Sequence, residues 1–283
     1  MADNSPPDQP DVFDLLAERF SDAPTRADGI PNASLLTSMA GRGSCRSFLD
    51  KPVPDAWINL LSAVALATPT KSDLQQRDII VLRSPEKRKR LATLVSGQAW
   101  VADAPMIIVF CGNNRRQRLV HDRLSIPFAN DHLDAFFNAV GDAAIALAGF
   151  VTAAEALSLG CCPISAVRNE AQAVSDLLNL PQHVFPFAGL AIGFPADKPR
   201  ISKRLPMRAT YHVDAYTETD LEQNIDQYDQ ERAATQPYRS QRFPDQFSNS
   251  DAYSWSEDKA RQYSQPERED FGDFVRRKGF RFD

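Results

Sequence analysis

Residues 131–168 read DHLDAFFNAVGDAAIALAGFVTAAEALSLGCCPISAVR, and this stretch decides the fold. Its apolar side chains recur at helical spacing on two faces over residues 133–159, which predicts one long helix, apolar nearly all round. Such a helix lies inside a large core or is shared between subunits. Asp131 is the expected N-cap and Gly160 the expected stop. Pro163 then excludes helix, so the stretch is predicted to end as an extended segment, 161–167.

Shorter elements surround this helix along the chain. Three apolar runs are predicted to be buried strands: 78–82, 105–111 and 184–193. Helical spacing and capping residues predict further helices over residues 12–20, 32–39 (with Asn32 as cap), 86–95, 169–178, 219–233 and 267–278, and one that begins at Pro54 and Asp55. Residues 113–130 form a polar, Arg-rich excursion. Interleaved strands and helices indicate a layered α/β or α+β domain.

Composition narrows the class of protein. The net charge of -5 and the pI near 5.5 argue against a nucleic-acid-binding surface. No apolar run approaches the roughly 20 residues that span a bilayer, and the acidic N-terminus is unlike a secretory signal. Four cysteines in 283 residues fit reduced thiols. We therefore expect a cytoplasmic protein that binds neither nucleic acid nor membrane.

The chain is predicted to have three consecutive parts. Residues 1–30, which open with many prolines and aspartates, are expected to be a flexible extension. Residues 31–213 contain the predicted strands and the long helix, and form the core domain. Residues 214–283 are polar and aromatic and lack enough apolar residues for a core of their own, so they are expected to wrap a neighbouring subunit.

The sharpest local motif is Arg42-x-Ser44-x-Arg46. In an extended segment these three side chains point to one face, and two guanidinium groups with a hydroxyl suit a phosphate. Gly43 would allow a close approach of the backbone. A solvated basic turn before a helix explains the same residues equally well. The spacing alone leaves both interpretations open.

Two weaker motifs could serve the same ligand. The run 203–208 (KRLPMR) could add cationic groups to the phosphate, although surface charge in a loop is the commoner explanation. The loop 68–75 (TPTKSDLQ) has hydroxyls and an amide that could bind a heteroaromatic ring, as many loops do. Cys161 and Cys162 are expected to be packing residues, because a disulfide between adjacent cysteines is strained.

Several catalytic signatures are absent from the sequence. It has no G-x-G-x-x-G after a predicted strand, no Walker A motif, no G-x-S-x-G and no H-E-x-x-H. Its four histidines are scattered and no cysteine pair has zinc spacing, so no metal site is predicted. A classical nicotinamide fold, a P-loop enzyme, a hydrolase and a zinc enzyme are all disfavoured.

Taken together, the motifs resemble the FMN-dependent nitroreductase family, and most closely its NADPH-dependent flavin reductase and oxygen-insensitive nitroreductase subgroup. The resemblance covers roughly residues 41–283 and rests on RGSCRSFLDKPV, ATPTKSDLQ, SGQAWVADAPMIIVFC, EALSLGCCPISAVRN, LNLPQHVFPFAGLAIGFPAD, SKRLP and FGDFVRRKGFRF. It implies an α+β fold with a mostly antiparallel sheet between helix layers. It also implies a homodimer built on the long helix, with FMN at the interface and NADPH as co-substrate.

The resemblance also implies roles for individual residues. Arg42, Ser44 and Arg204 would hold the FMN phosphate and ribityl chain, and Arg46 would reach the pyrimidine edge of the ring as an electrostatic tuner. The remaining ring and ribityl contacts would be Thr68, Thr70, Gln75, Gln98, Ile164, Ser165 and Ala166. Arg239 and Arg242 would bind the 2′-phosphate of NADPH. The acceptor would be a nitroaromatic, a quinone or free flavin, with no catalytic side chain needed beside the flavin.

The chain departs from the subgroup at several positions. It has Pro163 where an aromatic residue is usual, and Ser165-Ala166 where two glycines are usual. Ser202 and Gly43 replace basic residues of the pattern. These changes favour an alternative, a specialised family member such as a biosynthetic dehydrogenase or a flavin-consuming enzyme. A flavin-binding protein without enzymatic activity, or a soluble dimer without flavin, are further alternatives.

Overall fold

The fold is described from a computed structural model that places residues 10–27, 29–31, 33–95 and 98–283. The chain divides into two compact units, and each unit is made of two stretches of sequence. Unit 1 comprises the residues up to Gly43 together with Arg200–Glu267, and unit 2 comprises Ser44–Pro199 together with Arg268–Asp283. The units therefore do not follow the three consecutive parts that the sequence predicts.

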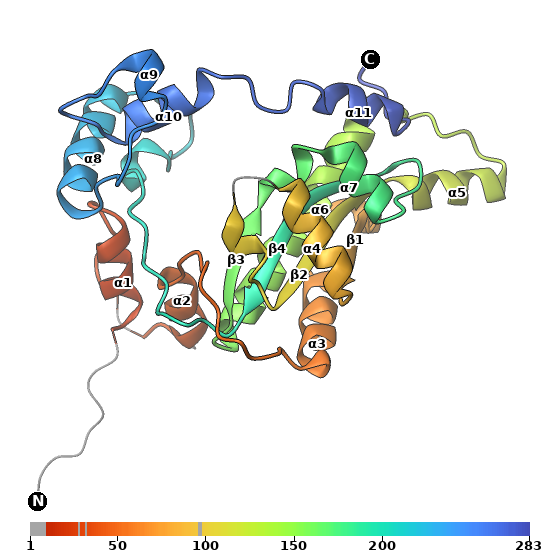
Figure 1. Ribbon diagram of the computed structural model, residues 1–283, viewed down its shortest axis with the longest axis horizontal. Coiled ribbons are helices and arrows are strands. Elements are labelled where there is room, and N and C mark those ends of the chain that lie inside the picture. Colours follow the sequence, from red (N-terminus) through yellow and green to blue (C-terminus); the bar gives the residue numbers. More distant parts are fainter. Residues whose placement is uncertain (1–9, 28, 32, 96–97) are drawn as a thin grey trace, which may run out of the picture. The chain divides into compact units, whose positions relative to one another are not determined.

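Unit 2 is built on one four-stranded antiparallel sheet with the strand order β1-β2-β4-β3 (Figure 1). Its strands are β1 (Arg77–Leu82), β2 (Met106–Asn113), β3 (Gly160–Ile164) and β4 (Val184–Gly193). The predicted strands and the antiparallel α+β fold are confirmed. The extended segment predicted over residues 161–167 stops at Ile164, because Ser165–Arg168 forms a single 3-10 turn, η3.

Helices cover both faces of this sheet and make two separate cores. On one face α3 (Asp55–Leu66) and α6 (Leu133–Ala156) pack on the sheet; on the other lie α4 (Pro85–Leu94) and α7 (Ala171–Leu177). Alternate residues of β2 serve the two cores: Ile108 and Phe110 face α6, whereas Ile107 and Val109 face α4 and α7. A third cluster joins α6, α7 and β4 to α11 (Phe271–Arg277). The layered sandwich is therefore closed by apolar packing on both sides.

Helix α6 confirms the long central helix, but its ends differ from the prediction. His132 is the N-cap, since its ring Nδ1 accepts a hydrogen bond from the Asp134 N–H at 3.3 Å. Asp131, the predicted cap, instead forms an ion pair with Arg118. The helix ends where Ser158 adopts a left-handed conformation (φ 59°). Both terminal residues predicted from the sequence are thus wrong, although the helix itself is correct.

Gly160 is the first residue of β3 rather than the stop of α6. A Cβ atom at this position would lie 2.5 Å from Sγ of Cys45. Glycine is therefore needed because the Cys45 side chain packs directly against β3 at this position.

One side of α6 is apolar and exposed in this chain. Leu133, Phe137 and Ile145 are exposed, Phe137 to 68%. By length and composition alone α6 could cross a bilayer, but its other side is packed in the core against α3 and the sheet. The apolar surface of α6 therefore has two sides, one buried in the core and one exposed.

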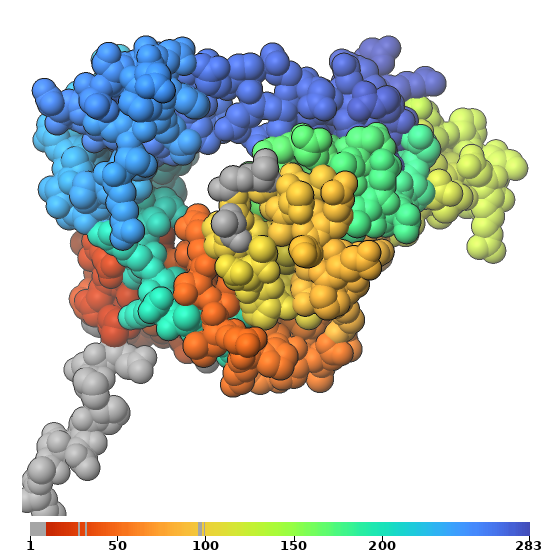
Figure 2. Space-filling model, in the orientation of Figure 1, coloured from red at the N-terminus to blue at the C-terminus, as the bar shows by residue number. Residues whose placement is uncertain are grey.

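Helix α5 (Arg115–Leu124) lies within the polar excursion predicted over residues 113–130. It stands out from the body of unit 2, at the right of Figure 1 and in yellow-green in Figure 2. Three of its apolar residues, Leu119, Val120 and Leu124, are more than half exposed. The excursion is therefore a helix that carries uncovered apolar side chains.

Unit 1 contains the helices α1 (Val12–Arg19), α2 (Ala33–Ala40), α8 (Leu221–Thr235), α9 (Pro244–Phe247) and α10 (Trp255–Tyr263), and the 3-10 turn η4 (Met207–Ala209). Helix α1 begins with a capping box in which Asp11 is the N-cap, and it packs on α2 and Ile201. The expectation of flexibility over residues 1–30 is therefore wrong for this helix. No helix was predicted for the residues that form α9 and α10, and Asn32, the predicted cap of α2, lies outside the described residues.

Candidate functional site

In unit 2, residues 44–46 form an extended segment along the free edge of β3. Ser44 makes a parallel bridge with Cys161, and the Cys45 N–H donates a hydrogen bond to the Cys161 carbonyl at 3.0 Å. The Cys45 side chain is buried and faces Gly160, whereas the Arg46 side chain is exposed. Residues 44–46 are therefore extended, and phosphate binding by the motif stays a prediction.

Arg46 lies beside Trp100. The guanidinium carbon of Arg46 is 5.8 Å from the centroid of the Trp100 ring. Trp100 belongs to the short turn η2 (Ala99–Val101). In this turn the Val101 N–H donates a hydrogen bond to the Gln98 carbonyl at 2.9 Å. Among the described residues no carboxylate forms an ion pair with Arg46, so its charge remains available to an anionic or electron-rich ligand.

The end of β3 lies next to the 44–46 segment. Pro163 and Ser165 are exposed, while Ile164 and Ala166 are buried in the core behind the sheet. Pro163 and Ser165 are therefore the residues that a ligand at this edge could reach. The structure therefore brings Ser44, Arg46 and residues 164–166 together in unit 2.

The loop between α3 and β1 carries three more of the predicted residues, and it holds its own shape. The Thr68 hydroxyl donates to the Ala65 carbonyl at 2.6 Å, and the Thr70 hydroxyl accepts from the Gln75 N–H at 3.1 Å. The Gln75 amide donates to Asp73 at 3.1 Å. The oxygen of Thr68 can still accept a hydrogen bond from a ligand, and the hydroxyl proton of Thr70 can still be donated to one.

Asp142 of α6 anchors this loop, a role that was not predicted from the sequence. Its carboxylate is almost fully buried and accepts hydrogen bonds from the Lys71 N–H (2.9 Å) and the Gln76 N–H (2.7 Å). The buried guanidinium of Arg77 lies 3.9 Å from the same carboxylate. The signal in the sequence was a single acidic residue in the apolar stretch of the long helix, which has to have a partner when it is buried.

In unit 1, Arg42 and Arg204 are brought to a common neighbour, Arg19. The Arg19 guanidinium donates to the Arg42 carbonyl at 2.6 Å, and the Arg204 N–H donates to the Arg19 carbonyl at 2.9 Å. The Arg204 side chain is exposed, with a guanidinium nitrogen 3.2 Å from the Lys203 carbonyl. Arg42 and Arg204 thus belong to one unit, and Ser44 and Arg46 to the other.

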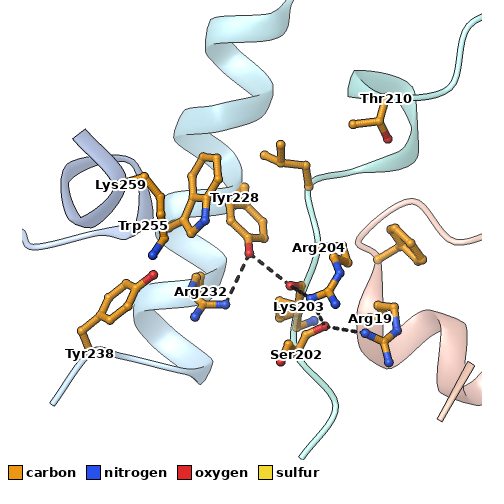
Figure 3. Close-up of a pocket in the computed structure, with 12 residues that line it drawn as sticks. Arg19, Ser202, Lys203, Arg204, Thr210, Tyr228, Arg232, Tyr238, Trp255 and Lys259 are labelled. Carbon is orange, nitrogen blue, oxygen red and sulfur yellow. Dashed lines mark hydrogen bonds between the residues drawn. The ribbon is translucent and has the colours of Figure 1, made fainter. Parts of the chain in front are cut away.

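Unit 1 also contains a cavity of about 550 Å³ beside Arg204 (Figure 3). No acidic residue is among its described lining residues, which suits an anionic ligand. Tyr228 donates its hydroxyl to the Lys203 carbonyl at 3.1 Å, and the Arg232 guanidinium carbon lies 5.1 Å from the Tyr238 ring centroid. The lining is basic and aromatic, and comprises Arg19, Phe20, Ser202, Lys203, Arg204, Leu205, Thr210, Tyr228, Arg232, Tyr238, Trp255 and Lys259.

Arg239 and Arg242 differ in their surroundings. Arg239 is exposed and follows the cavity residue Tyr238. Arg242 is 3.1 Å from a carboxylate oxygen of the buried Asp258. Although burial acts to raise the pKa of Asp258, hydrogen bonds from Lys259 and Tyr253 keep it below its usual value. Both arginines are exposed, but Arg242 is paired with a buried anion, whereas Arg239 forms no ion pair with any of the described residues.

Neither a reactive thiol at Cys45 nor a metal cluster among the described residues accompanies these groups. Burial raises the pKa of the Cys45 thiol, so this cysteine stays protonated at neutral pH. The part of the chain that the structure describes contains no group of three or more His, Cys, Asp or Glu side chains that could hold a metal ion. Cationic, hydroxyl and backbone groups remain, and these suit a phosphate and a heteroaromatic ring.

Comparison with known proteins assigns the family. Residues 39–194 match the model of the nitroreductase family, and residues 202–283 match its C-terminal domain. The chain is 34% identical over 202 residues to the "FMN reductase [NAD(P)H]" of Bacillus subtilis, covering 70% of this chain and 80% of the relative. It is 35% identical over 195 residues to the "Oxygen-insensitive NADPH nitroreductase" of Salmonella typhimurium, covering 69% and 79%.

A solved structure with the same fold is that of NfrA2 from B. megaterium. It has a TM-score of 0.80 and 29% sequence identity, and covers 88% of this chain and 99% of that chain. The oxidoreductase YcnD of Bacillus subtilis gives a TM-score of 0.80 at 28% identity with the same coverage. The family models cover both units, and the relatives match over most of their length. The chain therefore belongs to the nitroreductase family.

Proposed function

We propose that the protein is an FMN-dependent oxidoreductase that takes a hydride from NADPH and delivers two electrons to a nitroaromatic, a quinone or free flavin. The observation that carries this proposal is the exposed edge of β3 in unit 2. There Arg46, which has no carboxylate partner among the described residues, lies beside Trp100, and Pro163 and Ser165 are exposed at the end of β3. Relatives named as an FMN reductase and an NADPH nitroreductase support the same cofactor and donor.

FMN, when bound, supplies a ring that accepts a hydride at N5 and gives it up again. Arg46 would stabilise the negative charge that builds up at the pyrimidine edge of the reduced ring. Ser44 would donate its hydroxyl to the ribityl-phosphate chain, and the backbone N–H groups of residues 164–166 would face the ring. Thr68, Thr70, Gln75 and Gln98 would bind the remaining polar atoms. Donor and acceptor would use the same opening in turn, which gives ping-pong kinetics.

In unit 1 the proposal assigns Arg42 and Arg204 to the phosphate of FMN. Arg239 and Arg242 are proposed to bind the 2′-phosphate of NADPH, with Arg239 as the stronger contributor because Arg242 is paired with Asp258. The cationic cavity next to Tyr238 supports an anionic ligand in this unit. A guanidinium group that is not already paired with a carboxylate binds a phosphate more strongly, which favours Arg239 over Arg242.

We further propose that the protein acts as a homodimer in the cytoplasm. The apolar side of α6 that carries Leu133 and Phe137 is exposed, and so are Leu60 and Val64 of α3. Helix α5 adds three exposed apolar side chains. Exposed apolar residues on neighbouring helices favour an interface with a second copy, as the family resemblance predicts.

A specialised acceptor is the second candidate function, because of Pro163 and Ser165. Both side chains are exposed at the β3 edge, where the related subgroup has an aromatic residue and a glycine. The side chains present here would change the space over the ring. Slow turnover with quinones and nitroaromatics, despite bound FMN and rapid reduction by NADPH, would favour this candidate.

The test is the visible spectrum of the purified protein, followed by anaerobic addition of NADPH. We expect a two-band flavin spectrum that bleaches, and an Arg46→Ala variant that retains less FMN and reacts more slowly. Lys89→Ala, an exposed cation on α4, is the matched control and should behave as wild type. A colourless protein that takes up no added FMN would refute the proposal. Wild-type flavin content and rate in Arg46→Ala would refute the role of Arg46.

A further inference from the structure

Helix α1 lies outside the part of the chain that matches the family. The family model begins at residue 39, whereas α1 spans Val12–Arg19. Its last residue, Arg19, has only 6% of its surface exposed. A buried guanidinium has to be compensated by hydrogen bonds, so its partners show what the helix contributes to unit 1.

Among the described residues, the Arg19 guanidinium donates to backbone carbonyls on two segments far apart in sequence. Its Nη2 donates to the Ala40 carbonyl at 2.9 Å and to the Arg42 carbonyl at 2.6 Å. Its Nη1 donates to the Ser202 carbonyl at 3.1 Å, drawn in Figure 3. A planar guanidinium fixes the directions of its donors, so both segments are held in one geometry.

The residues after α1 continue along the second segment. The Arg204 N–H donates to the Arg19 carbonyl at 2.9 Å. The carboxylate of Asp22 accepts the backbone N–H groups of Met207 (2.5 Å) and Arg208 (2.9 Å). Backbone on both sides of Arg204 is therefore tied to Arg19 and Asp22.

We propose that Arg19 is a positioning residue for phosphate binding: it fixes the segments that carry Arg42 and Arg204 so that both guanidinium groups meet the FMN phosphate. This inference rests on the proposed function, because it takes Arg42 and Arg204 as the phosphate ligands. It adds a role for a helix outside the family match. Arg19 donates to the protein backbone, and the phosphate is bound by the two arginines whose backbone it holds.

The test compares the affinity of the apoprotein for FMN with its affinity for riboflavin, which lacks the phosphate. Both can be measured by flavin fluorescence quenching. Arg19→Gln should lower the ratio of FMN affinity to riboflavin affinity by about tenfold, because only the phosphate contacts lose their geometry. General loosening of the unit would weaken both ligands alike and leave the ratio unchanged. The control is Arg26→Gln, an exposed residue of the same extension that pairs with Asp11 and Asp14, and it should keep the wild-type ratio.

Arg19→Lys and Asp22→Asn decide the question if Arg19→Gln does not fold. Lysine keeps the charge but cannot reach three carbonyls, and the asparagine keeps one of the two backbone acceptors of Asp22; each should lower the ratio by severalfold. An unchanged ratio in the folded variants would overturn the inference, and so would an equal fall in Arg26→Gln. If the wild-type protein binds neither flavin, the proposed function fails instead. If it binds FMN and riboflavin equally, Arg42 and Arg204 are not phosphate ligands and the inference falls with them.

Discussion

Replacing Asp142 by asparagine removes one charge from a buried site. It also replaces one carboxylate oxygen, a hydrogen-bond acceptor, with an NH2 group, which is a donor. The carboxylate, 1% exposed, accepts two backbone N–H groups and lies 3.9 Å from the buried Arg77 guanidinium. The asparagine oxygen can accept one N–H, but its NH2 group then faces the other. Arg77 loses its buried counter-charge, although it still donates to the Leu66 and Thr68 carbonyls.

The expected loss is large. Breaking a buried ion pair by removing one partner costs about 3–5 kcal/mol. The backbone N–H that is left without an acceptor costs roughly 1–3 kcal/mol. The same substitution causes this cost, so it is already included in the figure of about 3–5 kcal/mol. Since domains are stable by about 5–15 kcal/mol, Asp142→Asn should lose a substantial part of the free energy of unfolding.

Urea unfolding followed by circular dichroism measures this loss, at one fixed protein concentration because the stability of the proposed dimer would depend on it. Asp134→Asn, exposed in the first turn of the same helix, is the control and should cost less than about 1 kcal/mol. A loss below about 1.5 kcal/mol in Asp142→Asn would show that the loop does not depend on this carboxylate, and the account of the anchor would be wrong.

Three further predictions concern other sites. Gly149→Ala should destabilise the protein by about 1–3 kcal/mol, despite the better helix propensity of alanine, because the new Cβ would lie 2.4 Å from Cγ2 of Thr68. Adding Thr68→Ser, which removes that methyl group, should restore stability. A Gly149→Ala variant more stable than the wild type would contradict the contact. Burial and the Arg118 charge lower the pKa of His183, so the unfolded chain takes up its proton first and stability falls as the pH drops from about 6.5 towards the folded-state pKa. His183→Gln should flatten that fall in a series of unfolding curves between about pH 7 and 5, and an unchanged slope would exclude His183 as its source. Removing Arg239 and Arg242 together should raise the Michaelis constant for NADPH about tenfold while that for NADH stays within about twofold, and equal effects on both cofactors would reject their role at the 2′-phosphate.

The sheet and the long helix were predictable because their signals are local. β2 and β4 are continuous apolar runs with polar flanks, and α6 repeats apolar residues over more than six turns. The ends of α6 were wrong because tertiary partners decided them: Arg118 pairs with Asp131, and Cys45 packs against Gly160. Helices α9 and α10 were missed because their residues are mostly polar and carry little apolar periodicity.

The site was predictable only in part, for a physical reason. Ser44 and Arg46 stand out because an extended motif has a fixed spacing, and the structure places them beside the edge strand β3. Trp100, Asp142 and Arg19 act through contacts with residues distant in the sequence. Such contacts follow from the fold rather than from spacing, and one sequence gives no sign of which carbonyl a buried arginine will reach.

The return of α11 to unit 2 also bears on how the protein is made. The third core cluster of that unit needs Phe274, Val275 and Phe280, and Lys278 bonds to the Leu180 carbonyl at 2.7 Å. These residues are synthesised last, because Arg268–Asp283 follows the whole of unit 1 in the sequence. The sheet can therefore pair early, but its apolar cluster around Phe185 stays uncovered until synthesis is nearly over. During that interval the nascent chain exposes an apolar, aggregation-prone surface. The yield of folded protein in the cell should therefore depend on chaperones and on the rate of translation through residues 200–267.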